Sequence, residues 1–206
     1  MKKFLMTAVL GMFALAGFSQ VKWDARVGMN FSNVTKADNT KALPGFQLGV
    51  GMDYGFSENW SLQSGLMISS KGYKYDYKDE YYNESYKYKA RPIYLDIPIL
   101  AAYKFNISDN TKFVINAGPY LAFGLGGKYN YDEGEDPKIF KDYEDEKGWK
   151  RFDLGIQYGI GLEIGEHYLV NLTGQNGFIT PYDFEDGYEG DKPKNMTFSI
   201  GVGYRF

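Results

Sequence analysis

Cysteine is absent from this chain of 206 residues, and histidine occurs only once. The absence of cysteine excludes disulfide bonds, thiol catalysis and thiolate metal sites. The single histidine, His167, lies in a short turn-like stretch and has no second histidine for metal or triad chemistry. We therefore expect His167 to be an ordinary turn residue, and we predict a protein that is not an enzyme and carries no metal or cofactor.

Long apolar runs are also lacking, except at the N-terminus. Two lysines precede an apolar run from Phe4 to about Ala16, and small residues follow it, which is the layout of a secretory signal peptide. We predict a cleaved signal peptide over residues 1–20 and one mature domain over residues 21–206. Removal of the two lysines leaves 21 basic and 26 acidic residues, so the mature chain is acidic and a nucleic-acid partner is not expected.

Glycine, tyrosine and phenylalanine are abundant, with 25, 19 and 15 residues. Aromatic residues favour strands, and glycine permits close approaches between them. Large apolar residues recur at every second position, which places them on one face of a strand and the polar residues on the other. Eight stretches with this period predict eight strands: 22–31, 46–54, 60–73, 93–105, 112–126, 151–164, 168–180 and 195–206.

The connections between these stretches alternate in length. The long ones cover 32–44, 74–90, 127–150 and 181–194, whereas the others are the short segments "GFSEN", "NISDN" and "GEH". Short turns on one side and long loops on the other are typical of a bacterial outer-membrane barrel. An even number of strands places both termini on the side of the short turns.

Two kinds of eight-stranded barrel fit the alternation, because a soluble barrel points its apolar face inward and a membrane barrel points it outward. The polar face here is rich in glycine with single charged residues between, which favours a narrow lumen. We therefore predict an all-β fold, an eight-stranded antiparallel up-and-down transmembrane β-barrel. The charged residues of the polar face are expected to pair in the lumen: Asp24, Arg26, Asp53, Lys71, Asp96, Asp153, Glu163 and Arg205.

Aromatic residues lie near the short-turn ends of the predicted strands, as in an interfacial girdle. They are Tyr54, Phe56, Trp60, Phe105, Tyr168, Tyr204 and Phe206. The chain ends on the alternating stretch "SIGVGYRF". An open sheet edge in lipid leaves backbone groups unsatisfied, so this last strand must pair with the first. Pro98 and Pro119 each remove a ladder donor and predict β-bulges.

The chain resembles the Bacteroidetes-type outer-membrane β-barrel proteins, also labelled PorT-like or "porin family", in five stretches: "WDARVGMNFS", "YLDIPILAAYKF", "NAGPYLAFGLGG", "FDLGIQYGIGLEI" and "SIGVGYRF". The resemblance implies the outer membrane of a Gram-negative cell, with periplasmic termini and extracellular long loops. It implies that the outer-membrane insertion machinery reads the C-terminal aromatics Tyr204 and Phe206. It transfers no catalytic or ligand-binding residue.

The long loops are rich in tyrosine and acidic residues, and two interpretations stay open for them. They form either a solvated rim or a recognition surface, since tyrosine gives contact area at low entropic cost. Clustered carboxylates also suit Ca²⁺ or Mg²⁺, which would bridge to lipopolysaccharide phosphates. Expected partners are outer-membrane lipid, lipopolysaccharide, the insertion machinery and an unidentified extracellular or secretion-machinery protein. We predict a structural or interaction role, with a narrow porin or transporter as the alternative.

Overall fold

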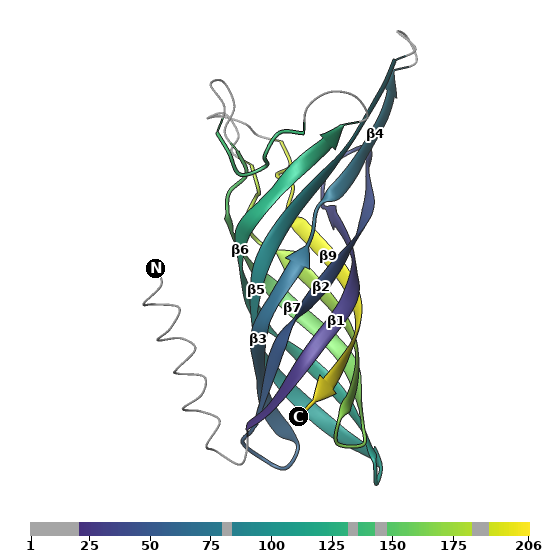
Figure 1. Ribbon diagram of the computed structural model, residues 1–206, viewed down its shortest axis with the longest axis vertical. Helices are drawn as coiled ribbons and strands as arrows, with labels where there is room; N and C mark the ends of the chain where they lie inside the picture. Colours follow the sequence, from purple (N-terminus) through teal and green to yellow (C-terminus); the bar gives the residue numbers. More distant parts are fainter. Residues whose placement is uncertain (1–20, 80–83, 132–135, 143–147, 183–189) are drawn as a thin grey trace.

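The computed structural model describes residues 21–79, 84–131, 136–142, 148–182 and 190–206. The predicted signal peptide, residues 1–20, lies outside them. Nine strands form one antiparallel sheet, and β1 pairs with both β2 and β9, which closes the sheet into a ring (Figure 1). The strands are β1 (Val21–Val34), β2 (Thr40–Gly55), β3 (Trp60–Ser70), β4 (Tyr73–Asp79), β5 (Glu84–Ser108), β6 (Thr111–Tyr131), β7 (Phe152–Ile164), β8 (Tyr168–Gly177) and β9 (Asn195–Arg205).

The ring has eight positions, because β3 and β4 follow one another in the same place between β2 and β5. The prediction of an eight-stranded up-and-down barrel is thus confirmed. The predicted strand 60–73 is interrupted after Ser70, at Lys71 and Gly72. Gly72 has a φ of 118°, and a Cβ there would lie 1.9 Å from the carbonyl oxygen of Ala90, so only glycine allows this step.

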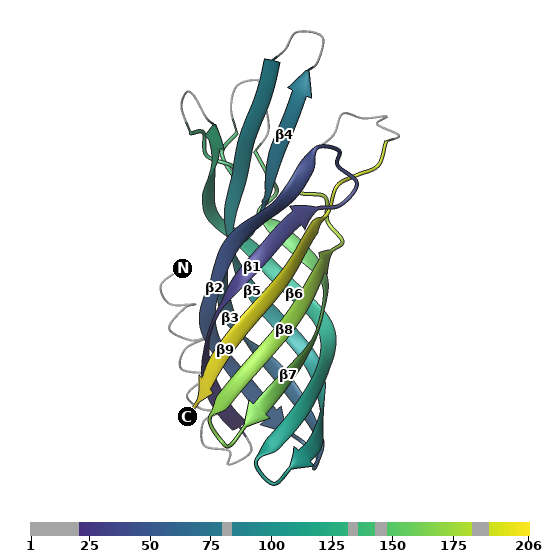
Figure 2. The same ribbon diagram turned by 90° about the vertical axis from the view of Figure 1, so that its right-hand side faces the viewer.

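Residues 74–90, which the sequence predicted as a loop, mostly form a β-hairpin instead. β4 pairs with the first residues of β5 from Tyr73–Ala90 outward, and the hairpin projects beyond the ring (Figures 1 and 2). β5 has 25 residues and β6 has 21, so both are longer than predicted. The predicted loop 32–44 is also shorter than expected, because only residues 35–39 separate β1 from β2.

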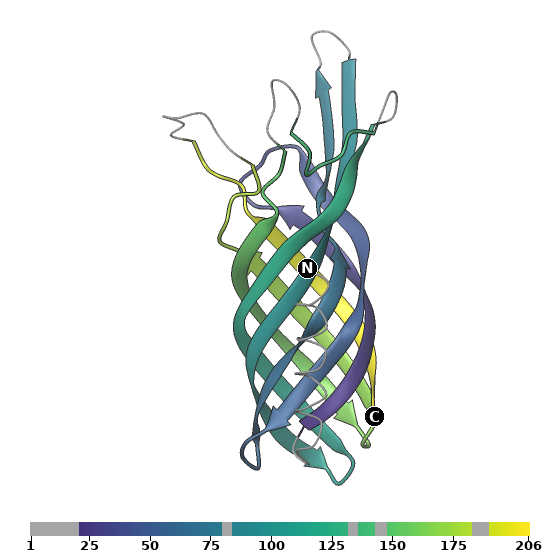
Figure 3. The ribbon, with the colours of Figure 1, turned by 60° about the vertical axis from the view of Figure 1, so that its left-hand side comes forward.

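The predicted alternation of connections is confirmed for the short turns, which are 56–59, 109–110 and 165–167. Figure 3 shows them at the end of the barrel where the C-terminus lies, with the longer connections at the opposite end. We call these the turn end and the loop end. Gly165, with a φ of 61°, forms the three-residue turn together with Glu166 and His167.

The predicted bulges at the two prolines are wrong. Pro98 pairs with Tyr120 and Pro119 with Ile156, and neither position shifts the register. Proline removes a ladder hydrogen bond without inserting a residue, so the strand keeps its alignment. A register shift occurs between Ile93 and Tyr94 instead, where β6 carries one extra residue between two glycines.

The exterior of the barrel is apolar and its interior is polar. On β7, Ile156 is 41% exposed and Ile160 is 44% exposed, whereas Gln157 between them is buried. All seven aromatic residues predicted for the girdle at the turn end are exposed. An apolar exterior over a polar interior suits lipid as the surrounding solvent. No helix among the described residues is long and apolar enough to cross a membrane.

Candidate functional site

A group of ion pairs crosses the lumen near the turn end. Arg205 on β9 donates two hydrogen bonds of 2.8 Å to the carboxylate of Glu163 on β7. Lys104 on β5 lies 2.9 Å from Glu163 and 2.7 Å from Asp53 on β2. We call these four residues the turn-end cluster. They connect four strands across the lumen, and none of their side chains is more than 12% exposed.

Amides extend the turn-end cluster toward the middle of the barrel. Gln63 donates a hydrogen bond of 2.9 Å to Asp53 and accepts one of 2.9 Å from Asn116.

On β1, Nη2 of Arg26 donates to the fully buried Asp24 at 2.9 Å. Charges taken out of water need such partners, because an unpaired buried charge is strongly unfavourable.

A second buried pair lies near the loop end. Nζ of Lys71 is 2.8 Å from Asp96, and both side chains are at most 3% exposed. The same ammonium lies 4.8 Å from the ring centre of Tyr120 and 5.4 Å from that of Tyr94, within range of cation–π attraction. Lys71 directly follows β3, so this pair fixes the step between β3 and the projecting hairpin.

Asp153 is satisfied by neutral donors. Its carboxylate accepts hydrogen bonds of 3.0 Å from Tyr120, 3.0 Å from Asn195 and 2.9 Å from the backbone of Leu154. Asp153, Tyr120, Lys71, Asp96 and Tyr94 form the loop-end cluster.

The structure places all eight charged residues named from the sequence on the inward face, seven of them buried and Arg26 partly so. Two clusters and the Asp24–Arg26 pair account for all of them. The sequence reasoning missed Lys104, which bridges Asp53 and Glu163. The signal was present, because Lys104 shares the alternation of Asp96 in the stretch 93–105.

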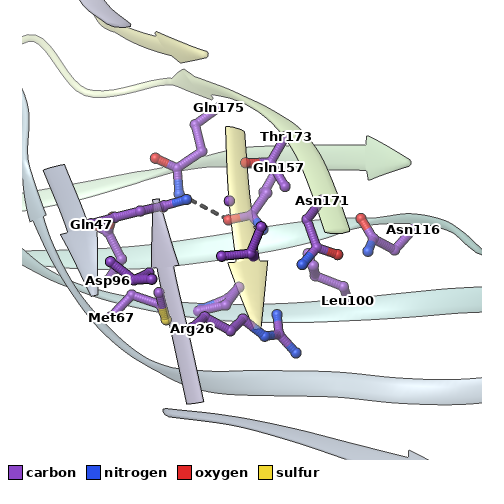
Figure 4. Close-up of a pocket in the computed structure, with 14 residues that line it drawn as sticks. Arg26, Gln47, Met67, Asp96, Leu100, Asn116, Gln157, Asn171, Thr173 and Gln175 are labelled. Carbon is purple, nitrogen blue, oxygen red and sulfur yellow. Dashed lines mark hydrogen bonds between the residues drawn. The ribbon is translucent and has the colours of Figure 1, made fainter. Parts of the chain in front are cut away.

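A cavity of about 40 Å³ lies between the two clusters. Amide side chains line much of it, including Gln47, Asn116, Gln157 and Gln175 (Figure 4). Gln175 donates a hydrogen bond of 2.8 Å to Gln157, and Oδ1 of Asn116 is buried without a protein partner. The volume suits a few water molecules. Side chains thus fill the lumen above and below a small polar cavity.

Aromatic side chains cover the loop end of the lumen. The rings of Tyr73 and Trp149 stack with centres 6.1 Å apart, and Nε1 of Trp149 donates a hydrogen bond of 2.6 Å to the hydroxyl of Tyr129. Tyr182 packs edge-on against Trp149 at 5.1 Å. Burial raises the pKa of Tyr182 to about 12 and also raises the pKa values of Tyr73 and Tyr129. We call these four residues the aromatic cap.

The projecting hairpin continues the aromatic cap outward. Tyr75 lies opposite Tyr88 and Tyr77 opposite Tyr86, with ring centres 5.0 and 6.5 Å apart. Tyr131 of β6 joins them 5.5 Å from Tyr88. These five tyrosines line an open groove of about 830 Å³, which we call the tyrosine groove. It presents ring faces and hydroxyls together on a pair of hydrogen-bonded strands.

The C-terminal residues form an aromatic group at the turn end. The ring of Tyr204 stacks on His167 at 5.2 Å, and Phe206 lies 5.9 Å from Tyr204. Nδ1 of His167 is 2.8 Å from the carbonyl oxygen of Arg205, and the backbone nitrogen of Phe206 donates a hydrogen bond of 2.9 Å to the carbonyl oxygen of Trp23. The last residue is therefore bonded to the first strand.

No group of three or more histidine, aspartate or glutamate side chains in the described part of the chain is placed to hold a metal ion. Much of the acidic loop sequence, at residues 132–135, 143–147 and 183–189, lies outside the described residues. The alternative that these loops hold Ca²⁺ or Mg²⁺ thus falls on residues outside the described part of the chain, and the prediction that the protein carries no metal stays a prediction.

Comparison with known proteins agrees with this architecture. A major outer membrane protein of Thermus thermophilus has a TM-score of 0.52 at 14% identity, over 90% of this chain and 99% of that one. OprG of Pseudomonas aeruginosa (17% identity, 90% and 95%) and Neisserial surface protein A (14% identity, 91% and 98%) both score 0.47. At 14% identity, the likeness to the Thermus protein concerns the fold alone. No curated protein sequence matches the chain significantly. The profile of one family matches residues 16–180, and the chain therefore belongs to the outer membrane protein beta-barrel domain family.

Proposed function

We propose that this protein is a non-enzymatic, non-conducting outer-membrane barrel that presents the tyrosine groove outside the cell to a protein partner, either extracellular or part of a secretion machinery. The observation that carries the proposal is the filled lumen. The turn-end and loop-end clusters pack it from opposite ends, and the cavity between them has a volume of about 40 Å³.

The buried ion pairs oppose opening of a solute path. Separating Lys71 from Asp96, or Arg205 from Glu163, would leave charges unpaired among buried side chains. Breaking a buried pair in this way is strongly unfavourable. An eight-stranded barrel is also just wide enough for its own side chains.

The tyrosine groove suits recognition because its rings are already ordered. Cross-strand ring pairs hold Tyr75, Tyr77, Tyr86 and Tyr88 in place before any partner binds. Tyrosine loses little side-chain entropy and offers both apolar area and a hydroxyl, so it is enriched in binding surfaces. The hairpin projects beyond the ring, where a large partner can reach it (Figure 2).

Planar-bilayer conductance of the refolded protein tests the closed lumen. We expect no defined conductance steps from the wild type. A Lys104→Ala/Arg205→Ala variant, which removes both cations of the turn-end cluster, should also show no steps, because the loop-end cluster and the aromatic cap still fill the other end. Stable steps from the wild-type protein would refute the closed lumen and restore the narrow-porin alternative.

Photo-crosslinking on intact cells tests the recognition role. A photoreactive phenylalanine in place of Tyr86, which is 51% exposed in the groove, should capture one discrete protein. The same residue in place of Tyr168, which is 62% exposed at the turn end, is the matched control and should not capture it. Identical products from both positions would contradict a groove-specific partner.

We also propose that both mature termini are periplasmic and the loop end is extracellular. Trypsin added to intact cells should cut at the lysines of 74–90, while Lys112 beside the short turn 109–110 becomes accessible only after the outer membrane is disrupted. The reverse order would invert the orientation. The sequence stretches quoted above support a narrower placement among Bacteroidetes-type, PorT-like barrels.

A further inference from the structure

The outward face of the hairpin base carries a row of lysines across three neighbouring strands. Lys41 on β2 lies directly opposite Lys74 on β4, and Lys74 lies directly opposite Lys89 on β5. One row nearer the ring, Arg91 on β5 lies opposite Lys128 on β6. We call these five residues the basic rows.

Few acidic groups balance the basic rows. Among the described residues, Asp76 pairs with Lys41 at 2.9 Å, and Asp136 accepts a hydrogen bond of 2.9 Å from Asn130, which lies opposite Lys89. These two carboxylates face five cations of the basic rows. The hydrogen bond from Lys41 lowers the pKa of Asp76, so this carboxylate is ionised at neutral pH. Lys87, opposite Asp76, adds a further cation.

Directly opposed like charges destabilise a sheet. The alignment contains two such pairs, Lys41 opposite Lys74 and Lys74 opposite Lys89. The other face of the hairpin is stabilised by stacked tyrosines. An external anion that lies against the outward face would convert the repulsion into attraction.

The position of the basic rows identifies the anion. On β5 the outward residues continue from Lys89 and Arg91 to Ile93, Leu95, Ile97 and Ile99, which belong to the apolar exterior. At about 3.3 Å per residue, Arg91 lies about 7 Å and Lys89 about 13 Å beyond Ile93 along the strand. Cations at that height face the headgroups of the lipid layer that surrounds the loop end.

We propose that the basic rows bind the phosphate groups of a lipid headgroup at the loop end, namely those of lipopolysaccharide. The choice of lipopolysaccharide rests on the orientation proposed above, whereas phosphate binding itself does not. Ammonium groups attract phosphates as compact point charges, and Arg91 adds a planar donor. The two faces of the hairpin thus have separate tasks, with the lysines toward the lipid and the tyrosines toward a protein partner.

Binding of purified lipid A to the detergent-refolded protein tests the proposal. The variant Lys74→Gln/Lys89→Gln removes two cations of the row. Its matched control is Lys22→Gln/Lys112→Gln, which removes two exposed lysines at the turn end. We expect the wild type to prefer phosphorylated over dephosphorylated lipid A, and the row variant to bind the phosphorylated form roughly tenfold more weakly. The control should stay within about twofold, because its charges lie far beyond the screening length.

Thermal unfolding separates lipid binding from a structural role. Without lipid, the row variant should unfold at a higher temperature than the wild type, because the like-charge contacts are relieved. With phosphorylated lipid A this order should reverse. A lower unfolding temperature in both conditions would make the lysines structural and overturn the proposal. Equal binding of phosphorylated and dephosphorylated lipid A would overturn the proposal. Displacement of lipid A by a soluble acidic polysaccharide would also overturn it. Neither result affects the conductance or crosslinking tests.

Discussion

Replacing Lys71 by methionine tests whether water reaches the loop-end cluster inside the lumen. The substitution keeps a long side chain but removes the ammonium that lies 2.8 Å from Asp96. It leaves a carboxylate that is 3% exposed without this cation, and it also removes the cation from the rings of Tyr94 and Tyr120. Breaking a buried pair from one side costs about 3–5 kcal/mol, so we expect the free energy of unfolding of Lys71→Met to fall by that amount.

The double variant Lys71→Met/Asp96→Leu is the control that separates the cost of an unpaired Asp96 from the loss of the Lys71 side chain. It replaces the whole pair by apolar side chains of similar length, which is often neutral or stabilising. We expect its free energy of unfolding to lie within about 1 kcal/mol of the wild-type value. Asp153 nearby keeps its hydrogen bonds from Tyr120 and Asn195 in both variants.

Urea unfolding from lipid vesicles, followed by tryptophan fluorescence and by the heat-modifiable gel mobility of the folded barrel, measures both variants. A loss below about 1 kcal/mol for Lys71→Met would mean that water reaches Asp96 and screens it. That result would refute the dry loop-end cluster and, with it, the main support for a non-conducting lumen. A double variant as unstable as the single one would instead make Lys71 a packing residue.

Three further predictions concern the lipid face, the C-terminus and the aromatic cap. Ile156→Arg should lower the free energy of unfolding by roughly 2–4 kcal/mol near the bilayer midplane, and Gln157→Asn on the inward face should cost less; equal losses in urea unfolding would contradict the lipid-facing assignment. Deletion of Phe206 should reduce assembly in cells, read from gel mobility of the outer-membrane fraction, while detergent refolding survives; normal assembly would exclude an insertion signal. The pKa of Tyr182 is raised from 10.0 to about 12, so the stability that its neutral form contributes is complete below pH 10 and is lost as the pH rises through about 12. Trp149 fluorescence should report this opening, and Tyr182→Phe should abolish it.

The barrel itself could be predicted from the sequence because its main signal is local. A period of two in the side chains, such as that from Phe152 to Ile164, needs only one strand to be visible. The same period also predicts the inward residues of each stretch, and it therefore identifies the charged lumen residues without showing which of them pair. Which of them pair across the lumen depends on strand stagger, and stagger is a property of two strands together.

The hairpin was missed although its signal was of the same kind. Tyr73, Tyr75 and Tyr77 alternate with Lys74 and Asp76, but the high charge of the segment suggested a solvated loop. The charged composition of residues 74–90 predicts a loop, whereas their period-two alternation predicts the strands that the structure contains. The like-charge alignment of Lys74 with Lys89 was out of reach, because it exists only once the hairpin register is known.

The bond between Phe206 and Trp23 has a consequence for how the molecule is made. It joins residues 23 and 206, and the β1–β9 seam as a whole makes the contacts of greatest sequence separation in the sheet, whereas the other strand pairs are hairpin neighbours. Until β9 is in place, β1 presents an unpaired edge, and such edges pair readily with other chains. A chain that lacks β9 therefore keeps β1 as an open edge that is prone to aggregation, and closure of the barrel must wait for the last strand.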